Sequence, residues 1–197
     1  MTAAAAGIGV RAIEPSEERA LSDELASHLP TRTPFGLPSW RDAWWATLGR
    51  GQRLSLLAAV DGAPAVLAPW FIDGDVVYPA AVDGADRLDV VGAATAASMT
   101  ALVDAARRTT PSWLGLLLYH LPRESPTVAA LGAAAEALGL DLAVHDTYVL
   151  PAIDLTDRTW VERVVDRTSL RRHHRRLAAL GDITIERQRT PEGIERW

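Results

Sequence analysis

Two Asp-Gly pairs, at residues 61–62 and 73–74, are the feature that most constrains how this chain can fold. Each pair separates segments rich in apolar residues. Asp-Gly is a strong signal for a tight turn between antiparallel strands, because both residues tolerate positive φ. The three strands that these turns join are expected at residues 53–60, 65–72 and 75–78. The sequence therefore predicts a three-stranded antiparallel meander.

The segments on either side of the meander alternate between helical and extended patterns. Helices are expected at residues 16–28, 38–49, 95–108, 125–139 and 157–180. Strands are expected at residues 8–13, 87–91, 114–119 and 183–186, and within 142–150. The uninterrupted apolar run at 114–119 is typical of a central strand that is buried on both faces. This order predicts a mixed α/β domain with the meander at its centre.

The composition excludes several classes of chemistry. The 197-residue chain contains no cysteine, which excludes a thiolate nucleophile, a disulfide framework and a cysteine-based zinc site. It contains no lysine, which excludes Schiff-base chemistry and a lysine-dependent phosphate loop. No basic segment precedes the apolar N-terminus, and no stretch approaches the roughly 18 apolar residues of a membrane span, so we expect a cytoplasmic location.

The charge is unevenly distributed along the chain. Residues 1–157 carry ten arginines and nineteen acidic residues, whereas residues 158–197 carry ten arginines and six acidic residues. The acidic part is a poor candidate for binding anions. Any anion-binding function is therefore expected in the last forty residues.

An arginine-rich segment at residues 169–177 is the sharpest of the candidate binding features. Helical periodicity places four arginines on one side, namely Arg171, Arg172, Arg175 and Arg176, opposite a stripe of leucine and histidine. This face could be solvated or cover another domain, could bind phosphates of coenzyme A or of a nucleotide-linked substrate, or could contact nucleic acid or an anionic membrane. The adjacent His173 and His174 lack a third ligand nearby, so no metal site is expected.

Aromatic residues form a second candidate. Trp40, Trp44 and Leu48 recur every four residues on an expected helix, with Trp45 beside them. This spacing is typical of a helix face that packs in the core. Alternatively, the indoles line the rim of a ligand cleft, where their flat faces suit sugars, bases or pantetheine-like chains.

His120 and Asp89 are the candidates for catalysis. His120 follows the apolar run at 114–119, and active sites of α/β proteins gather where central strands end. It could act as a general base or play a structural role through hydrogen bonds. Asp89 stands among apolar residues, so its carboxylate is expected either to pair with Arg87 or Arg123 or to face a cleft.

The sequence lacks the motifs of several large enzyme classes. It contains no G-x-G-x-x-G turn, no Walker loop and no G-x-S-x-G elbow. It also lacks the Arg/Gln-x-x-Gly-x-Gly/Ala turn that cradles the pyrophosphate in acetyl-CoA-dependent acyltransferases. The segment at 92–95 opens a helix after a strand but lacks this glycine spacing, so its N–H groups are expected to bind anions only weakly.

Several segments together resemble the CelD-type, FemAB-like branch of the GNAT acyltransferase superfamily. They are Thr33-Pro34-Phe35, Pro38-Ser39-Trp40 with Trp44, the hairpin at 54–70, Leu121-Pro122 with Ser125-Pro126, Trp160, Leu170-Arg171-Arg172 and residues 177–181. The resemblance runs over about residues 30 to 190, and none of its motifs is a catalytic signature. It implies a GNAT-like, mostly antiparallel sheet flanked by helices.

The resemblance also implies a function and a domain organisation. It implies an N-acyltransferase that uses acetyl-CoA or another acyl-CoA, linked to polysaccharide or cell-envelope biosynthesis, with a small-molecule, glycan or nucleotide-sugar acceptor. Proteins of this branch contain two GNAT-like halves, so residues 1–156 are expected to form a degenerate first half and residues 157–197 to open a second one. The segment at 35–44, with Trp40 and Trp44, and the four arginines would face the acceptor cleft. Nucleic acid is not an expected partner.

Two alternatives stay open. The chain could instead be a non-catalytic module that binds an anionic glycan, a nucleotide-linked acceptor or a partner chain. Residues 190–192, Thr-Pro-Glu, have the pattern of a helix start close to the last residue, Trp197. We therefore expect the chain to stop inside a second domain, or else to end in a short helix docked through Ile194 and Trp197.

Overall fold

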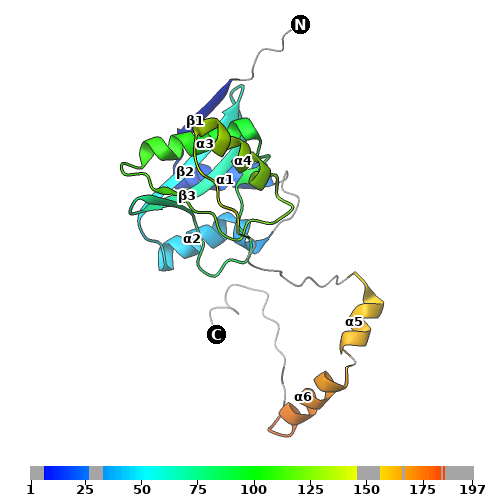
Figure 1. Ribbon diagram of the computed structural model, residues 1–197. Helices are drawn as coiled ribbons and strands as arrows, with labels where there is room; N and C mark the ends of the chain where they lie inside the picture. Colours follow the sequence, from blue (N-terminus) through cyan, green and yellow to red (C-terminus); the bar gives the residue numbers. More distant parts are fainter. Residues whose placement is uncertain (1–6, 27–32, 146–155, 166, 183, 185–197) are drawn as a thin grey trace. The chain divides into compact units, whose positions relative to one another are not determined.

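The computed structural model describes residues 7–26, 33–145, 156–165, 167–182 and 184 (Figure 1). Contacts divide the chain into two units, Met1–Val144 and His145–Trp197. The first unit contains the sheet and the helices that cover it. The described residues of the second form two short helices. The expected strand at 183–186 and the helix start at 190–192 fall mainly or wholly outside the described residues.

A six-stranded, mostly antiparallel sheet forms the centre of the first unit. Its strands are β1 (Ile8–Ala12), β2 (Gln52–Val60), β3 (Ala63–Asp73), β4 (Val76–Pro79), β5 (Val91–Gly92) and β6 (Gly115–Leu116). The order is β1-β2-β3-β4-β6, and β5 also pairs with β3. The predicted meander is confirmed as β2, β3 and β4. Asp61 and Gly62 join β2 to β3 with φ of 50° and 84°, as the Asp-Gly signal requires.

Strands β4 and β5 pair with different parts of β3. Pro79 of β4 lies opposite Trp70, whereas Gly92 of β5 lies opposite Val66. The intervening residues 80–90 leave the sheet, so the strand predicted at 87–91 is wrong except for its last residue. The backbone N–H of Leu88 donates to the carbonyl of His120, 3.2 Å away, instead of joining the β3 ladder.

The prediction of a buried central strand at 114–119 is wrong. Only Gly115 and Leu116 form a strand, and they pair in parallel with β4 at the end of the strand order. Leu114 is 76% exposed and Tyr119 is 40% exposed. An uninterrupted apolar run identifies an extended segment but not the number of strands beside it. Among the described residues, the one strand that pairs with β6 is β4, which has four residues. For the strand expected within 142–150, residues 142–145 are irregular and the others lie outside the described residues.

The predicted helices of the first unit are confirmed with small shifts of their ends. They are α1 (Pro15–Leu25), the short 3₁₀ helix η2 (Pro34–Gly36), which was not predicted, α2 (Pro38–Thr47), α3 (Ala96–Thr109) and α4 (Pro126–Leu138). The single helix expected at 157–180 is instead two helices, α5 (Arg158–Val165) and α6 (Thr168–Ala178). Arg167, with ψ of 136°, takes an extended backbone before α6. The β-branched residues Val164, Val165 and Thr168 have low helix propensity and favour this break.

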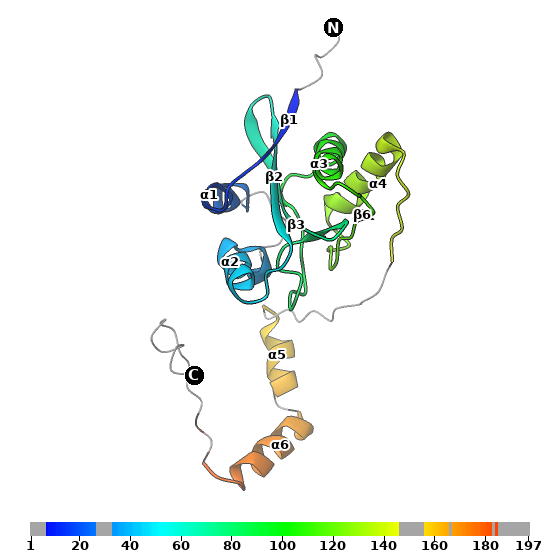
Figure 2. The same cartoon turned by 90° about the vertical axis from the view of Figure 1, so that its left-hand side faces the viewer.

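The helices cover both faces of the sheet. Figure 2 shows α1 and α2 on one side and α3 and α4 on the other. Alternate residues of β2 follow this division: Leu56 packs in the core formed with α3 and α4, whereas Leu57 packs in the core that includes α1. Trp44 of α2 and Phe71 of β3 belong to a third cluster. The predicted class, a mixed and mostly antiparallel sheet flanked by helices, is therefore confirmed.

A capping box starts α3. The Thr95 hydroxyl accepts a hydrogen bond from the Ser98 N–H at 3.1 Å, and the Ser98 hydroxyl accepts one from the Thr95 N–H at 3.0 Å. We expect Thr95→Ala to lower the free energy of unfolding by about 1 kcal/mol, because the Ser98 N–H loses the hydroxyl that accepts its hydrogen bond. Urea denaturation measures this change. Thr109→Ala, which removes an exposed hydroxyl at the other end of α3, is the control, and an equal loss there would contradict the capping role.

Candidate functional site

A small pocket opens in the first unit where regular pairing of the sheet ends. It encloses about 40 Å³. Three segments line it, from η2 and the residue before it, from the stretch that leads into β5, and from the loop that leads into α4. Its lining residues are Thr33, Gly36, Arg87, Leu88, Asp89, Val90, Val91, Pro122, Glu124 and Ser125. A second, smaller depression shares Leu88, Asp89 and Val90 with it.

The backbone around His120 explains why the pocket forms there. Beyond β6, the N–H of Leu117 still donates to the Val77 carbonyl at 2.9 Å. At His120 the chain adopts a φ of 58°, a left-handed conformation that turns it away from the sheet. The loop at 121–125 then leads into α4, where the Ser125 hydroxyl accepts a hydrogen bond from the Thr127 N–H. Prolines and this helix cap fix one wall of the pocket.

Asp89 is held in place by hydrogen bonds. Its Oδ1 accepts a hydrogen bond from the Thr127 hydroxyl at 2.6 Å and one from the Val90 N–H at 2.8 Å. The side chain is half-buried and lines both depressions. Of the two alternatives predicted for it, the structure therefore places the carboxylate at a cleft.

Arg87 pairs with Glu124 at the mouth of the pocket. A hydrogen bond from its own backbone holds the pKa of Glu124 below its ordinary value, and the neighbouring Arg87 lowers this pKa further. Glu124 is therefore ionised at neutral pH. The pocket carries the carboxylates of Asp89 and Glu124 and one guanidinium, an arrangement that favours a small cationic group such as an amine.

The two catalytic candidates lie on adjoining segments. Leu88, the neighbour of Asp89, is hydrogen-bonded to His120 through the backbone. The imidazole of His120 is exposed and lies 6.3 Å from the Tyr119 ring, measured between centroids, but it does not line the pocket. The structure thus brings the two segments together and, of the two candidates, places only Asp89 in the pocket wall.

The two tryptophans predicted to bind substrate have different surroundings. Trp44 is 3% exposed, packs on Phe71 with 5.1 Å between ring centroids, and donates from Nε1 to Asp83. Burial acts to raise the pKa of Asp83, but hydrogen bonds from Trp44 and Arg50 lower it, and the net pKa is below its ordinary value. Trp40 is half-buried and meets Phe35 of η2 edge to face at 5.0 Å. Its buried Nε1 has no hydrogen-bond partner among the described residues.

The four arginines predicted to bind substrate all lie on α6 in the second unit. Arg171, Arg172, Arg175 and Arg176 are exposed, and α6 contains no acidic residue. Leu170 and Leu177, on the apolar stripe, are exposed as well. Within the described part of the chain, no three histidine or acidic side chains come together as a metal site would require, and no helix has the length and apolar character needed to cross a membrane.

Sequence reasoning missed one cluster beside the pocket. Glu18 and Arg41 form a buried ion pair between α1 and α2. The spacing of Glu18, Ser22 and Leu25 gave a signal, because it places the carboxylate and hydroxyl on the same helix face as a core leucine.

Comparison with known proteins gives matches among solved structures. No protein-family model matches the sequence, and no curated protein does. A possible acetyltransferase from Clostridium difficile 630 matches at 12% identity with a TM-score of 0.44, over 75% of this chain and 99% of that chain.

Two further matches are structures of aminoglycoside N-acetyltransferases. The aminoglycoside N-acetyltransferase AAC(6')-Iy, in complex with CoA, matches at 12% identity with a TM-score of 0.42, over 78% of this chain and 100% of that chain. The aminoglycoside 6'-N-acetyltransferase AAC(6')-Ih from Acinetobacter baumannii matches at 16% identity with a TM-score of 0.42, over 75% and 100% of the two chains.

Proposed function

We propose that this protein is an N-acyltransferase of the GNAT superfamily and that its pocket holds the acceptor amine. One observation carries the proposal. The segments at 33–35 and 121–126 resemble those of GNAT acyltransferases, and residues of both, Thr33, Pro122, Glu124 and Ser125, line the same pocket. Segments that are far apart in the sequence thus supply two walls of one site. Following the same resemblance, we propose an acceptor from polysaccharide or cell-envelope biosynthesis and a second GNAT-like domain that opens at residues 157–197.

The chemistry requires a base near the acceptor. When an amine attacks an acyl thioester, a nitrogen–carbon bond forms, the carbon–sulfur bond breaks, and the amine must lose a proton. The Asp89 carboxylate faces the pocket in an orientation fixed by Thr127, and Glu124 supplies a second negative charge that attracts a protonated amine. We assign the proton transfer to Asp89, with His120 as the other candidate.

The described residues of the first unit do not fit coenzyme A at the start of α3. The Ser98 N–H is already bonded to Thr95, and a Cβ on Gly92 would lie 2.2 Å from the Ala65 carbonyl oxygen, so this glycine serves backbone packing. The four arginines of α6 match the charge of the coenzyme's phosphates and are our candidates for holding them.

The small pocket and the occupied helix start favour a second candidate, a non-catalytic binding module for an amine-bearing acceptor or a partner chain. The two functions differ in their use of acetyl-CoA. A module binds the acceptor without it, whereas an acyltransferase binds acetyl-CoA and releases the free thiol only when an amine is present.

Calorimetric titration with acetyl-CoA and a thiol-release assay over a panel of primary amines test the proposal. We expect saturable binding and amine-dependent release, with Asp89→Asn lowering the rate by about 100-fold or more. Asp104→Asn, at an exposed carboxylate of α3 outside the pocket, is the matched control and should keep the rate. Amine binding without acetyl-CoA binding would instead establish the module, and binding of neither would reject both.

A further inference from the structure

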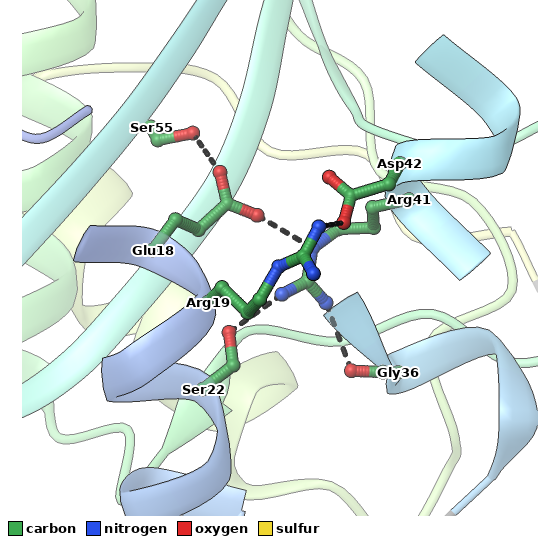
Figure 3. Close-up of polar contacts among 7 residues, drawn as sticks. All are labelled: Glu18, Arg19, Ser22, Gly36, Arg41, Asp42 and Ser55. Atoms are coloured by element: carbon green, nitrogen blue, oxygen red, sulfur yellow. Dashed lines mark hydrogen bonds and ion pairs between the residues drawn. The ribbon is translucent and has the colours of Figure 1, made fainter. Parts of the chain in front are cut away.

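A buried ion pair lies behind the pocket wall that η2 forms. Arg41 of α2 is 3% exposed and Glu18 of α1 is 7% exposed. Nε of Arg41 donates to Glu18 Oε1 at 2.7 Å, and the other Glu18 oxygen accepts a hydrogen bond from the Ser55 hydroxyl of β2 at 2.5 Å. Figure 3 shows these contacts between the two helices and the strand. The carboxylate is therefore bonded on both oxygens.

The other two nitrogen atoms of the Arg41 guanidinium donate hydrogen bonds to two further partners. Nη2 donates to the Ser22 hydroxyl at 2.6 Å, and Nη1 donates to the Gly36 carbonyl at 2.8 Å (Figure 3). A guanidinium is planar and holds its donors in a fixed fork, so its partners must keep a set geometry. One side chain thereby links α1, α2 and η2, and through Glu18 also β2.

Gly36 is the point where this network meets the pocket. Gly36 and Thr33 line the pocket opposite the segment at 87–91. The turn between them is closed by hydrogen bonds from the Gly36 N–H to the Thr33 carbonyl and from the Leu37 N–H to the Pro34 carbonyl. Arg41 adds a charged donor to the Gly36 carbonyl, from a side chain that is almost fully buried.

We propose that Arg41 is a positioning residue for the pocket: by holding the Gly36 carbonyl, it sets the place of the wall formed by Thr33 and Gly36 and so decides which amines the pocket admits. The inference rests on the proposed function in one respect only, that the ligand is an amine. The buried charge supports it. Apolar side chains could replace an ion pair that only joined two helices without loss of stability. They could not replace the Arg41 guanidinium in fixing the direction and length of the hydrogen bond to Gly36.

Amide hydrogen exchange of Gly36 and Leu37 tests the positioning directly in the full chain. Arg41→Lys keeps the charge but cannot reach Glu18, Ser22 and Gly36 together. We expect exchange at both amides to rise about tenfold, which is what loss of one charged hydrogen bond produces. Leu57→Ala is the control, because Leu57 lies in the core beside α1, does not itself line the pocket and is not a hydrogen-bond partner of Arg41. Its truncation lowers stability without removing the hydrogen bond to Gly36.

The second readout is kinetic. We expect Arg41→Lys to raise the KM of the preferred amine by about tenfold and to change kcat by less than about twofold, since a displaced wall alters binding and leaves Asp89 in place.

The outcomes of the two measurements can be told apart. Equal exchange at Gly36 in Arg41→Lys and Leu57→Ala would overturn the inference. If exchange rises as expected but the unmodified protein binds no amine, the proposed function fails and the wall assignment stands. If Arg41→Lys does not fold, the double variant Glu18→Leu with Arg41→Met replaces it, because this variant removes the donor to Gly36 without leaving an unpaired charge. Unchanged exchange at Gly36 in that variant overturns the inference equally.

Discussion

Arg41→Met is expected to lower the free energy of unfolding by about 3 to 5 kcal/mol. The substitution leaves the carboxylate of Glu18, at 7% exposure, without its counter-charge, and the Gly36 carbonyl and Ser22 hydroxyl lose a donor. A buried ion without a partner retains its full desolvation penalty, and this makes the loss larger than that of an ordinary hydrogen bond. Urea denaturation followed by circular dichroism measures the change.

A matched control lies on the same two helices. Arg19 of α1 and Asp42 of α2 also form an ion pair, but Arg19 is 66% exposed there. Water screens such pairs, so Arg19→Met is expected to lower the free energy of unfolding by less than about 1 kcal/mol. Similar losses in the two variants would show that burial adds nothing to the Glu18–Arg41 pair. The double variant Glu18→Leu with Arg41→Met should recover part of the loss, because it removes the unpaired charge.

The parts of the fold that local chemistry determines could be predicted from the sequence. Asp61-Gly62 specifies its turn by backbone conformation alone, and Gly139 ends α4 at a φ of 62°, which glycine adopts without strain. Pro38 occupies the first turn of α2, where its missing N–H costs nothing. These signals act within a few residues, so no knowledge of the tertiary structure is needed.

The wrong predictions concern pairing, which is a long-range property. The apolar run at 114–119 has the composition of a central strand, but only Gly115 and Leu116 form a strand, which pairs with the short strand β4. A strand is expected at 87–91 as well, but every residue except Val91 leaves the sheet, and the Leu88 N–H bonds to the His120 carbonyl instead. Nothing in either segment encodes how long its neighbour will be.

The candidate site was predictable in part, for the same reason. Asp89 stood out as a carboxylate among apolar residues, but its partner Thr127 is distant in sequence and could not be inferred. The sequence pattern places Glu18 on the same face of α1 as Leu25, but it does not show that Arg41 of α2 lies against this face. Only the packing of these helices on β2 buries Glu18 and Arg41 next to Ser55.

Gly92→Ala is expected to lower the free energy of unfolding by about 3 kcal/mol. Gly92 has a φ of +114°, and a Cβ there would lie 2.2 Å from the Ala65 carbonyl oxygen of β3. The strained backbone costs about 1 to 2 kcal/mol, and forcing a methyl group into closely packed backbone costs about 1 to 3 kcal/mol. The carbonyl of Ala65 cannot easily retreat, because it accepts a hydrogen bond from the Ala93 N–H.

Gly62→Ala separates the two contributions. Gly62 also has a positive φ, +84°, but a Cβ there would meet nothing within 4 Å. Its substitution should cost only the backbone strain, about 1 to 2 kcal/mol. Equal losses of unfolding free energy in the two variants, measured by urea denaturation, would show that β5 shifts to accommodate the methyl group.

The same substitution also tests the pocket. Because Val91 pairs with β3 beside Gly92 and also lines the pocket, a displaced β5 must move the wall opposite Gly36. Gly92→Ala should therefore weaken amine binding beyond any effect of Gly62→Ala, and it tests the pocket from the side that Arg41 does not hold.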